Sequence, residues 1–328
     1  MILAGDIGGT HARIGTFTVD GGRVKLVGEQ IYPSRDHRNL ESAVRAFLIT
    51  HNVTATTACF GVAGPVHKGI AMLPNLGWTV DAASLAHEIG IERVRLINDL
   101  EANAYGIAAL DASDLSVINP GAADVTGNAA VISAGTGLGE AGLYWDGKIL
   151  RPFACEGGHA DFAPSDPLQT EMLAWLQKQY THVSWERVLS GNGLFTIYRF
   201  LRDTGRGEEP AWLTDQLKND DPPPVITRAA LEKRSALCEM ALDLVIVLLG
   251  AEAANLALKI MATGGVYLGG GIVPRILAKL KEPAFMRAFT NKGRMSDLLG
   301  AIPVKVILND SAALLGAARC AALTAGLL

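Results

Sequence analysis

The hydrophobic positions at the start of the chain predict short strands separated by glycine-rich turns. Apolar residues run through 2–4 and recur through 12–19, and the segment 5–10 between them reads GDIGGT. A second turn, Asp20-Gly21-Gly22, precedes another apolar run at 24–27. Because Asp-Gly between two apolar runs is a strong hairpin signal, the pattern predicts three consecutive strands joined by tight turns.

Helical and extended patterns alternate in the next part of the chain. Apolar residues between 40 and 48 recur at helical spacing, on one face of a predicted helix. Two later apolar runs, 58–62 and 94–97, predict buried strands that end at Ala63-Gly64-Pro65 and at Asn98-Asp99. Strands alternating with helices in this way are typical of an α/β fold.

The segment 129–147 repeats the pattern of the opening segment. A strand at 129–133 leads into the turn AGTGLG and then to a second apolar run that ends at Asp146-Gly147. A shift of 126 positions without a gap superimposes four residues on identical ones: Gly9 on Gly135, Thr10 on Thr136, Asp20 on Asp146 and Gly21 on Gly147. We interpret the match as a duplicated lobe, although a glycine-rich chain can also produce it by chance. Two lobes predict a ligand cleft between them.

The remainder of the chain is mostly helical in pattern. Apolar residues at helical spacing predict helices over 168–176 and 235–262, and an alanine-rich run predicts a closing helix over 311–323 with Asn309 or Asp310 as its cap. The segment 203–224 is rich in glycine, proline and acids and ends in three prolines, which predicts a surface loop.

Composition narrows the class of protein. The 328 residues include 36 glycines, about 13 more than average usage, and the net charge of −4 has no compensating basic cluster. Nucleic acid is therefore an unsuitable partner. The four cysteines are scattered, which favours reduced thiols, and the start MILAGDIGG lacks the basic segment of a signal peptide. The apolar run 244–251 is far shorter than a membrane span, so we expect a cytoplasmic protein without a membrane partner.

Three glycine clusters, 5–10, 135–139 and 264–271, follow apolar runs. Glycine lets backbone N–H groups approach an anion closely, so these clusters indicate phosphate binding, whereas the simpler alternative is three tight turns. None is the lysine-bearing phosphate loop or the spaced dinucleotide fingerprint. Asp6, inside the first cluster, is a candidate ligand for Mg²⁺ carried by nucleotide phosphates; its alternative role is to cap the turn.

Several polar residues are candidates for a sugar site. Asp99, at the carboxyl end of a predicted strand, can accept a proton from a substrate hydroxyl, although Asn98-Asp99 can also simply end the strand. The segment Glu156-Gly157-Gly158-His159 and Glu186 are each compatible with ordinary surface positions. Taken together, these side chains fit the hydroxyl groups of a sugar. With the glycine clusters, they predict a site for nucleotide phosphates and a polyhydroxy acceptor.

The chain resembles the bacterial glucokinases, which belong to the hexokinase, Hsp70 and actin superfamily. The motifs that carry the resemblance occur in the family's order from Gly5 to about Gly316: GDIGGTHAR, GVAGPV, LINDLEA, SAGTGLGEAGL, EGGHADFAP, SWERVLSG and GGVYLGGGIVPR. The resemblance implies an α/β, two-lobed, actin-like ATPase fold of the ribonuclease H-like kind with an interdomain cleft. It also implies a small domain of residues 1–109 plus 311–328 and a large domain of residues 110–310.

The resemblance also implies an activity, ATP:D-glucose 6-phosphotransferase, with ATP, Mg²⁺ and D-glucose as its small molecules. Asp99 would be the catalytic base that takes the proton of the glucose 6-hydroxyl. The remaining sugar hydroxyls would be held by Asn75, Asn98, Glu156, His159 and Glu186. The nucleotide would be bound by Gly5, Asp6, Ile7, Gly8, Gly9, Thr10, Gly135, Thr136, Gly137, Gly269, Gly270 and Gly271, with the last three near the adenosine.

One departure from the family, one difference from a related family and three alternatives accompany this interpretation. His11 follows Thr10 where the family more commonly has asparagine, and His159 lacks the cysteine group with which the related ROK sugar kinases bind zinc. The alternatives are a kinase for another hexose, a non-catalytic nucleotide switch or filament former, and a sugar-responsive repressor. The last needs a helix-turn-helix before the first strand, which begins here at Ile2. A homodimer is expected from the family.

Overall fold

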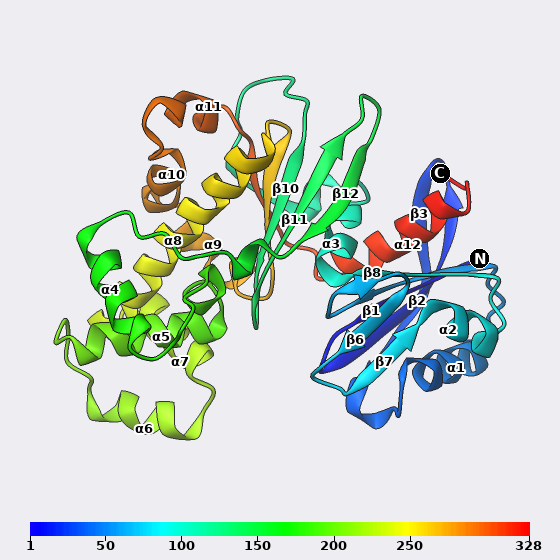
Figure 1. Cartoon of the computed structure of the whole chain (residues 1–328), viewed down its shortest axis with the longest axis horizontal. Helices are drawn as coiled ribbons and strands as arrows, with labels where there is room; N and C mark the ends of the chain where they lie inside the picture. Colours follow the sequence, from blue (N-terminus) through cyan, green and yellow to red (C-terminus); the bar gives the residue numbers. More distant parts are fainter. The chain divides into compact units, whose positions relative to one another are not determined.

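The computed structural model describes all residues, 1–328, and the chain divides into two compact units (Figure 1). The first unit comprises Met1–Leu115, Lys148–Ala154 and Asn309–Leu328, and the second comprises Ser116–Gly147 and Cys155–Leu308. Helices and mixed sheets occur in both, which confirms the predicted α/β class.

The first unit is built on a five-stranded sheet with the strand order β3-β2-β1-β4-β8. Strands β1, β2 and β3 are antiparallel neighbours, whereas β4 and β8 run parallel to β1. A small antiparallel sheet has the order β5-β6-β7. The strands are β1 (Ile2–Ile7), β2 (His11–Asp20), β3 (Arg23–Pro33), β4 (Thr57–Val62), β5 (Val66–His67), β6 (Ile70–Leu73), β7 (Trp78–Asp81) and β8 (Arg93–Asn98). The helices are η1 (Ser34–Asp36), α1 (Leu40–His51), α2 (Ala82–Ile89), α3 (Asp99–Ile107), η2 (Ala112–Asp114) and α12 (Ala312–Thr324).

Both faces of this sheet are covered, because successive side chains of a strand point to opposite faces. Leu3 and Ile7 of β1 belong to a core that includes Phe47 of α1. Ile2 and Ala4 of the same strand belong to a second core, with Leu314 and its neighbours on α12. The predicted helix over 40–48 and the closing helix are therefore confirmed, each with an apolar face on the sheet.

Two details of the first unit differ from the sequence analysis. Strand β8 is the edge strand of its sheet, and only Leu96 and Ile97 in it are buried, so it is not the buried strand that we expected. The N-cap of α12 is Ser311, not Asn309 or Asp310. The Asn309 side chain still contributes, because its Oδ1 accepts a hydrogen bond of 2.8 Å from the Ser311 N–H.

The second sheet has six strands in the order β12-β11-β10-β13-β14-β9. Its strands are β9 (Leu115–Asn119), β10 (Ala129–Ala134), β11 (Leu138–Trp145), β12 (Leu150–Cys155), β13 (Gly265–Gly269) and β14 (Val304–Ile307). The helices of the second unit are η3 (Gly157–His159), α4 (Pro167–Gln177), η4 (Trp185–Arg187), α5 (Gly191–Asp203), α6 (Ala211–Asn219), α7 (Pro222–Leu231), α8 (Ala236–Ile260), η5 (Val273–Ile276), α9 (Leu277–Leu280), α10 (Pro283–Thr290), η6 (Gly293–Met295) and α11 (Ser296–Gly300).

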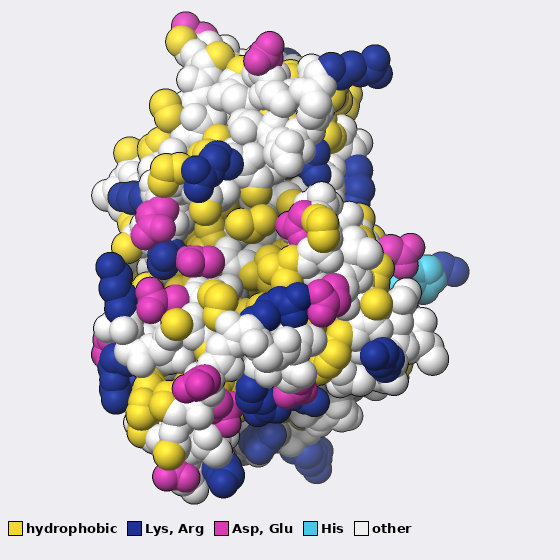
Figure 2. All heavy atoms as spheres, turned by 90° about the vertical axis from the view of Figure 1, so that its left-hand side faces the viewer, with side chains coloured by type: hydrophobic (Ala, Val, Ile, Leu, Met, Phe, Trp, Pro, Cys, Tyr) yellow, Lys and Arg dark blue, Asp and Glu magenta, His cyan; other side chains and the backbone are white.

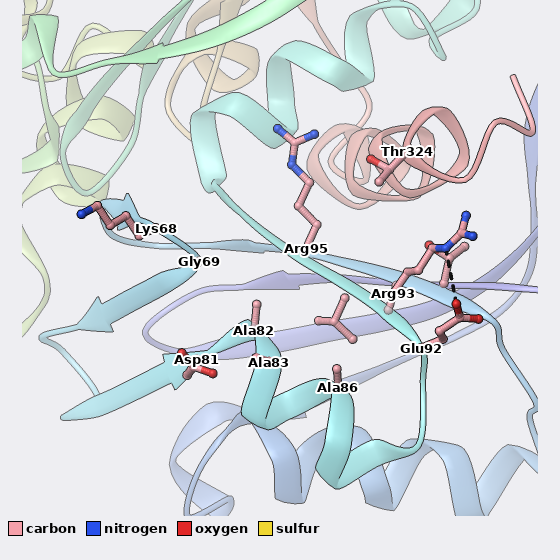
Figure 3. Close-up of a pocket in the computed structure, with 13 residues that line it drawn as sticks. Lys68, Gly69, Asp81, Ala82, Ala83, Ala86, Glu92, Arg93, Arg95 and Thr324 are labelled. Atoms are coloured by element: carbon pink, nitrogen blue, oxygen red, sulfur yellow. Dashed lines mark ion pairs between the residues drawn. The ribbon is translucent and has the colours of Figure 1, made fainter.

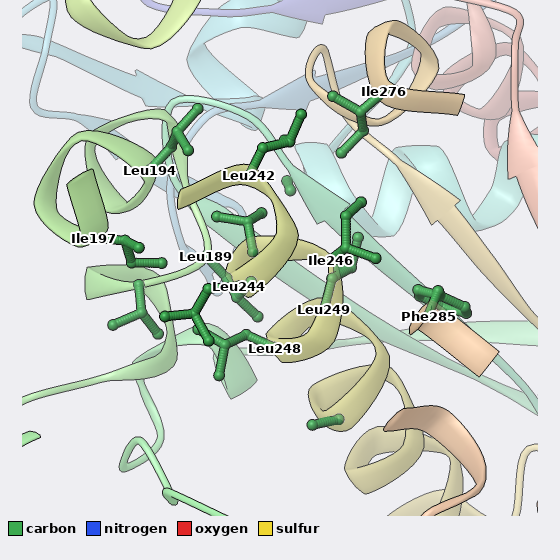
Figure 4. Packing of buried hydrophobic residues seen from close by; sticks show 14 of the residues in the cluster. Leu189, Leu194, Ile197, Leu242, Leu244, Ile246, Leu248, Leu249, Ile276 and Phe285 are labelled. Carbon is green, nitrogen blue, oxygen red and sulfur yellow. The ribbon is translucent and has the colours of Figure 1, made fainter. Parts of the chain in front are cut away.

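Helix α8 forms the centre of the second unit (Figure 4). It is apolar on all sides, which is typical of a helix surrounded by protein, and it packs against α5, α7, α10 and β10. By length and composition, α8 alone among the helices could cross a membrane, but 78% of its most apolar window is buried inside the unit. The apolar stretch is thus longer than the run 244–251 indicated, and the fold uses it as a core helix.

The segment 203–224 is not a surface loop, and this prediction was wrong. It contains all of α6 and the first turn of α7, which begins at Pro222. Proline lacks a backbone N–H, but the first N–H groups of a helix have no partner inside the helix, so prolines are tolerated there. The three prolines therefore begin a helix.

The predicted repeat is present in the topology, with a one-residue correction. The order β3-β2-β1-β4-β8 corresponds to β12-β11-β10-β13-β14 in the other sheet. Four residues separate the paired Ile7 and Ala12, but only three separate the paired Ala134 and Leu138. The second strands therefore align at a shift of 126, whereas the first strands align at 127. The gapless match of Gly9 on Gly135 holds only for the turn and the strand after it.

Charged side chains of both signs share the face of the molecule in Figure 2, and neither sign forms a large patch there. Within the second unit, several are paired: Arg206 with Glu171, and Arg202 with Glu209.

Candidate active site

Three parallel strands of the first unit end at the same level. Ile7 of β1 pairs with Val62 of β4, and Val62 pairs with Asn98 of β8. The segments that follow these strands therefore lie at one edge of the sheet, the carboxyl edge, where open α/β sheets bind their ligands. The carbonyl oxygen of Gly5 and the Cα of Asp99 each lie 3.8 Å from the position that a Cβ on Gly61 would take.

The turn Gly8–Thr10 is fixed by backbone and serine contacts. The Gly8 N–H donates to the His11 carbonyl at 2.9 Å, and Ser34 holds both ends of the turn. Its Oγ donates to the Gly8 carbonyl at 2.8 Å and its N–H to the Thr10 carbonyl at 2.9 Å. Asn75, predicted to bind sugar, lies against this turn, since its Cβ is 3.1 Å from the position of a Cβ on Gly9. Ser34 belongs to no motif, so the sequence did not indicate its role.

Asp6 precedes this turn and lies opposite Arg13 in the β1–β2 register. Burial raises the pKa of the Asp6 carboxyl to about 6, and the positive charge of Arg13 only partly opposes this effect. Arg13 is itself engaged elsewhere, at 3.2 Å from Asp310 and 2.5 Å from the Ser311 hydroxyl. The Asp6 carboxylate is therefore incompletely compensated, as expected for a group that binds a cation.

Asn98 and Asp99 form the start of α3. The Asn98 side chain caps the helix, because its Oδ1 accepts from the Leu100 N–H at 2.8 Å. Its amide nitrogen donates to the Gly64 carbonyl at 3.2 Å, which leaves one N–H of the amide for another partner. Asp99 is the first residue of the helix, and one of its oxygens accepts from the Leu100 N–H at 3.0 Å. The helix N-terminus stabilises the charge of this carboxylate.

The corresponding turn of the second unit, Gly135–Gly137, is held by a distant segment. Gly135 donates to the Gly137 carbonyl at 2.9 Å and accepts from the Gly191 N–H at 2.9 Å. The Oε2 of Glu186 accepts from the Leu138 N–H at 3.0 Å, directly after the turn. Ser190 caps α5 by accepting from the Gly193 N–H at 3.0 Å. The motif SWERVLSG thus places both a carboxylate and a helix start against the glycine turn.

The structure brings Glu156 and His159 close to each other on η3. The His159 side chain is 61% exposed and the Glu156 side chain is 65% exposed. His159 Nε2 lies 3.9 Å from Glu156 Oε2. The next residue, Ala160, accepts from the Trp185 N–H at 3.0 Å, which ties η3 to the segment that bears Glu186. His182, which no motif indicated, has its Nε2 2.9 Å from the His159 carbonyl.

The third glycine cluster, Gly269–Gly271, packs against the second turn, Gly135–Gly137. Strand β13 pairs with β10, and Gly270 follows it with φ 90°, a left-handed value that side chains rarely adopt. A Cβ there would also collide with the Ala134 carbonyl oxygen, so this position requires glycine. The same carbonyl accepts from the Ile272 N–H at 3.3 Å. Gly135–Gly137 and Gly269–Gly271 are therefore neighbours.

A pocket of about 370 Å³ lies beside these glycines in the second unit. Ile272, next to the third glycine cluster, and Leu194 of α5 contribute apolar walls, and Arg228 and Arg275 contribute positive charges. Its other lining residues are Pro223, Pro224, Thr227, Leu231 and Glu232. Helix α7 supplies much of the lining of this pocket. Because the sequence pattern was interpreted as a loop there, the pocket was not predicted.

A second pocket, of about 430 Å³, lies in the first unit (Figure 3). It is lined by the beginnings of β4 and β8, including Thr57 and Arg93, and by the start of α2. These are the amino ends of the parallel strands, so the pocket is at the edge opposite the candidate site residues. No group of three or more histidine, cysteine, aspartate or glutamate side chains is arranged to hold a metal ion.

Comparison with known proteins gives a consistent family. The glucokinase family model matches residues 3–324. The glucokinase of Nostoc punctiforme is 42% identical over 98% of this chain and 99% of its own. A crystal structure of a glucokinase from an Antarctic psychrotroph shares 33% identity and a TM-score of 0.86, with 98% of each chain covered.

A more distant structure, the glucokinase of Balamuthia mandrillaris in complex with glucose, has the same fold. It shares 21% identity at a TM-score of 0.79, covering 98% of this chain and 93% of its own. The family match spans nearly the whole chain, and the curated relative is far above the identity at which only a fold is shared. The chain belongs to the glucokinase family of sugar kinases.

Proposed function

We propose that the protein transfers the γ-phosphoryl group of ATP to the 6-hydroxyl of D-glucose, with Asp99 as the general base. The observation that carries this assignment is the position of Asp99 at the carboxyl edge of β1, β4 and β8, the same edge as the turn Gly8–Thr10. A carboxylate there can take the hydroxyl proton while the backbone of the turn binds phosphate oxygens.

The sugar is proposed to contact groups from both units. Asn75 and Asn98 supply amides in the first unit, and Glu156, His159 and Glu186 supply acceptors and donors in the second. The ties between η3 and η4 support a joint role of the three second-unit side chains. The glucose-bound Balamuthia mandrillaris glucokinase, which has the same fold, makes glucose the substrate to test first.

The nucleotide is proposed to bind along the glycine clusters. Gly5–Thr10 and Gly135–Gly137 would bind the phosphates, and Gly269–Gly271 would lie beside the adenosine. The 370 Å³ pocket next to Ile272 supports this arrangement, because its apolar walls suit a base. Arg228 and Arg275 in its lining suit the negative charge of a nucleotide.

Asp6 is the residue that fits a magnesium ion. Its carboxylate is partly buried, has a raised pKa and has no strong partner of its own, so a cation that arrives with ATP would compensate it. Bound there, Mg²⁺ would neutralise charge on the phosphates during transfer. Arg13, opposite Asp6, is held in place by its contacts with Asp310 and Ser311.

The equivalent order of five strands in the two sheets supports an actin-like, ribonuclease H-like architecture. We propose that the two compact units are the two domains of that architecture and that substrates bind in a cleft between them. A cytoplasmic location and a homodimeric state are proposed from the family.

A coupled assay of ADP release tests the assignment. The wild-type protein, Asp99→Asn and the control Asp36→Asn are compared with Mg-ATP and glucose, mannose or glucosamine. Asp36 is an exposed aspartate of η1 in the same unit. We expect turnover with glucose in the wild type and in the control, and a loss of about 10²–10⁴-fold in Asp99→Asn, the usual contribution of a general base.

The other outcomes separate the alternatives. Faster turnover with mannose or glucosamine would make the protein a kinase for another hexose. ADP release that is the same with and without sugar would indicate a nucleotide switch. An Asp99→Asn variant as active as the control would remove Asp99 from the role of base.

A further inference from the structure

Two glutamates of the second unit are buried side by side, away from the residues proposed to bind substrate. Glu140 lies on β11 and is 1% exposed, and Glu252 lies on α8 and is 0% exposed. Their carboxyl groups are close enough to share a hydrogen bond. Two carboxylates cannot both be charged at such a distance in a buried site without a large cost.

The charged groups around the pair compensate only part of this cost. Asn255 donates to Glu252 Oε2 at 2.7 Å, and Lys292 in turn donates to Asn255 at 2.6 Å. Lys259 Nζ lies 3.7 Å from Glu252 Oε1, beyond hydrogen-bond distance. The Oε1 atom of each glutamate has no hydrogen-bond partner. These contacts are all made with Glu252, and the side-chain hydrogen-bond partner of Glu140 is Glu252 itself.

The pair therefore retains one proton at a pH where an ordinary glutamate has lost it. Burial, and next the charge of Glu252, raise the pKa of Glu140 to about 8, while Lys259 opposes this effect. Burial also raises the pKa of Glu252. The two carboxyl groups thus share one proton near neutral pH, and this proton belongs to the pair and not to either residue.

Glu140 also packs against the backbone of η3. A Cβ on Gly157 would collide with Glu140 Oε2, so the backbone of η3 rests directly on this carboxyl group. Glycine is required at Gly157 for this close approach. Cys155, just before η3, receives the Gly157 N–H on its sulfur and feels the charge of Glu140. The residues on either side of Gly157–Gly158 are Glu156 and His159, the proposed glucose ligands.

We propose that Glu140 and Glu252 are positioning residues: the single proton they share holds η3 in the conformation that presents Glu156 and His159 to glucose. This inference rests on the proposed function for the identity of the ligand. Loss of the shared proton leaves two adjacent negative charges, and their repulsion pushes Glu140 against Gly157. Lys259, Lys292 and Cys155 are the other titratable groups that face the pair, and Glu156, the N-cap of η3, also acts on Cys155 through its charge.

The first measurement follows the KM for glucose and for ATP between pH 7 and pH 9. In the wild type, the KM for glucose should rise by up to about tenfold, the factor for a group that titrates near pH 8 and binds glucose only when protonated. In Glu140→Gln, the amide donates to Glu252 without titrating, so this rise should disappear. The KM for ATP should be insensitive to the substitution.

The second measurement does not depend on glucose. Hydrogen exchange is followed at the amides of His159 and Ala160, which donate within η3 at 3.0 Å and 2.9 Å. After correction for the intrinsic effect of pH on exchange, their protection should fall from pH 7 to pH 9 in the wild type and stay constant in Glu140→Gln. In Glu252→Gln, the buried Glu140 still titrates but no longer faces a charged carboxylate, so the fall in protection should move to a lower pH.

Two control variants isolate the pair. Glu239→Gln makes the same change on α8 at a partly exposed position and should retain the wild-type pH dependence. Cys155→Ser removes the neighbouring thiol, whose pKa burial raises, and should also retain it.

The results separate this inference from the proposed function. Protection that is independent of pH in the wild type, or equally pH-dependent in both glutamine variants, overturns the positioning role. A wild-type protein that does not phosphorylate glucose but shows the pH-dependent protection contradicts only the proposed substrate. Loss of the pH dependence in Cys155→Ser alone assigns it to the thiol and overturns the proposal as well.

Discussion

The two glycine turns occupy equivalent places in the two sheets, yet they are stabilised in different ways. The turn of the first unit follows a strand that carries its own charge, with Asp6 opposite Arg13. The equivalent pair in the other sheet is Ser133 opposite Gly139, which has no charge. There the carboxylate comes from Glu186 of η4, 48 residues after Leu138, from whose N–H it accepts a hydrogen bond.

The difference teaches how one backbone motif can serve two purposes. A carboxylate built into a strand has a fixed direction and is available to a cation that arrives with the ligand. A carboxylate supplied by a neighbouring helical turn, as Glu186 is by η4, also connects the glycine turn to the sugar that this segment is proposed to bind. We therefore expect the carboxylate of Asp6 to affect nucleotide chemistry alone, and the carboxylate of Glu186 to couple nucleotide and sugar binding.

The largest effect is expected for Asp6→Asn. Loss of the carboxylate removes the proposed ligand for Mg²⁺, so kcat should fall about 10²–10³-fold, as for other groups that stabilise transition-state charge. The KM for glucose should be unchanged. The measurement is steady-state kinetics with Mg²⁺ as a variable. Asp20→Asn, on the same hairpin but exposed, is the matched control, and an equal loss in both variants would contradict the role of Asp6.

A smaller but broader effect is expected for Glu186→Ala. This change removes the acceptor of the Leu138 N–H and a proposed sugar contact, so the KM of both glucose and ATP should rise about 10- to 100-fold, equivalent to roughly 1.5–3 kcal/mol for hydrogen bonds to a charged group. Glu186→Gln retains an acceptor for Leu138 and should restore most of the ATP effect. Glu208→Ala, at an exposed position, is the control. A rise in one KM only would show that the turn and the sugar site are not coupled through Glu186.

The turns themselves should tolerate a methyl group differently. At Gly137 a Cβ would collide with Glu186 Oε2, whereas at Gly8 the nearest atom is the His11 carbonyl oxygen at 3.3 Å. Gly137→Ala should therefore lower Tm and raise both KM values about tenfold, the effect of an overpacked site. Gly8→Ala should change the KM for ATP alone. Equal changes in Tm for the two variants would remove the distinction between the turns.

The smallest effect concerns stability and pH. The pKa of Asp6 is about 6 in the folded chain, above the ordinary value of 3.8, so the folded state binds this proton more tightly than the unfolded state. The free energy of unfolding therefore falls as pH rises from about 4 to 6, and the cost persists at pH 7. Asp6→Asn should raise Tm at pH 7 by about 2–5 °C in the absence of ligand, and scanning calorimetry at pH 4 and pH 7 would show whether the gain is confined to the higher pH.

Local patterns predicted most of the elements that carry the site. The glycine turns, the hairpin at Asp20-Gly21-Gly22 and the helices with one apolar face follow from residues that are adjacent or a few positions apart. The exact register of the repeat did not follow, because the extra residue in the first turn shifts one strand by a single position. Helix α7 was missed because the three prolines were interpreted as breakers and not as a helix start.

The contacts that build the site are of another kind. Glu186 reaches Leu138, Ser34 holds the turn after β1, and Glu140 meets Glu252 only because the fold brings these segments together. None of these pairs has a characteristic spacing, so the family resemblance, and not the pattern, pointed to Glu186. Glu140 and Glu252 had no such support and were found only through their burial.

The first unit is assembled from three stretches of chain, and this has a consequence for how it is made. The core that contains Ile2 and Ala4 is closed by Leu314 and other residues of α12, roughly 300 positions later. During synthesis, β1 leaves the ribosome early but one of its faces has no partner until α12 follows. The second unit, by contrast, runs from Ser116 to Leu308 with only Lys148–Ala154 set apart, so all of it is synthesised before α12. One face of β1 therefore obtains its packing partner only after the whole second unit has been synthesised.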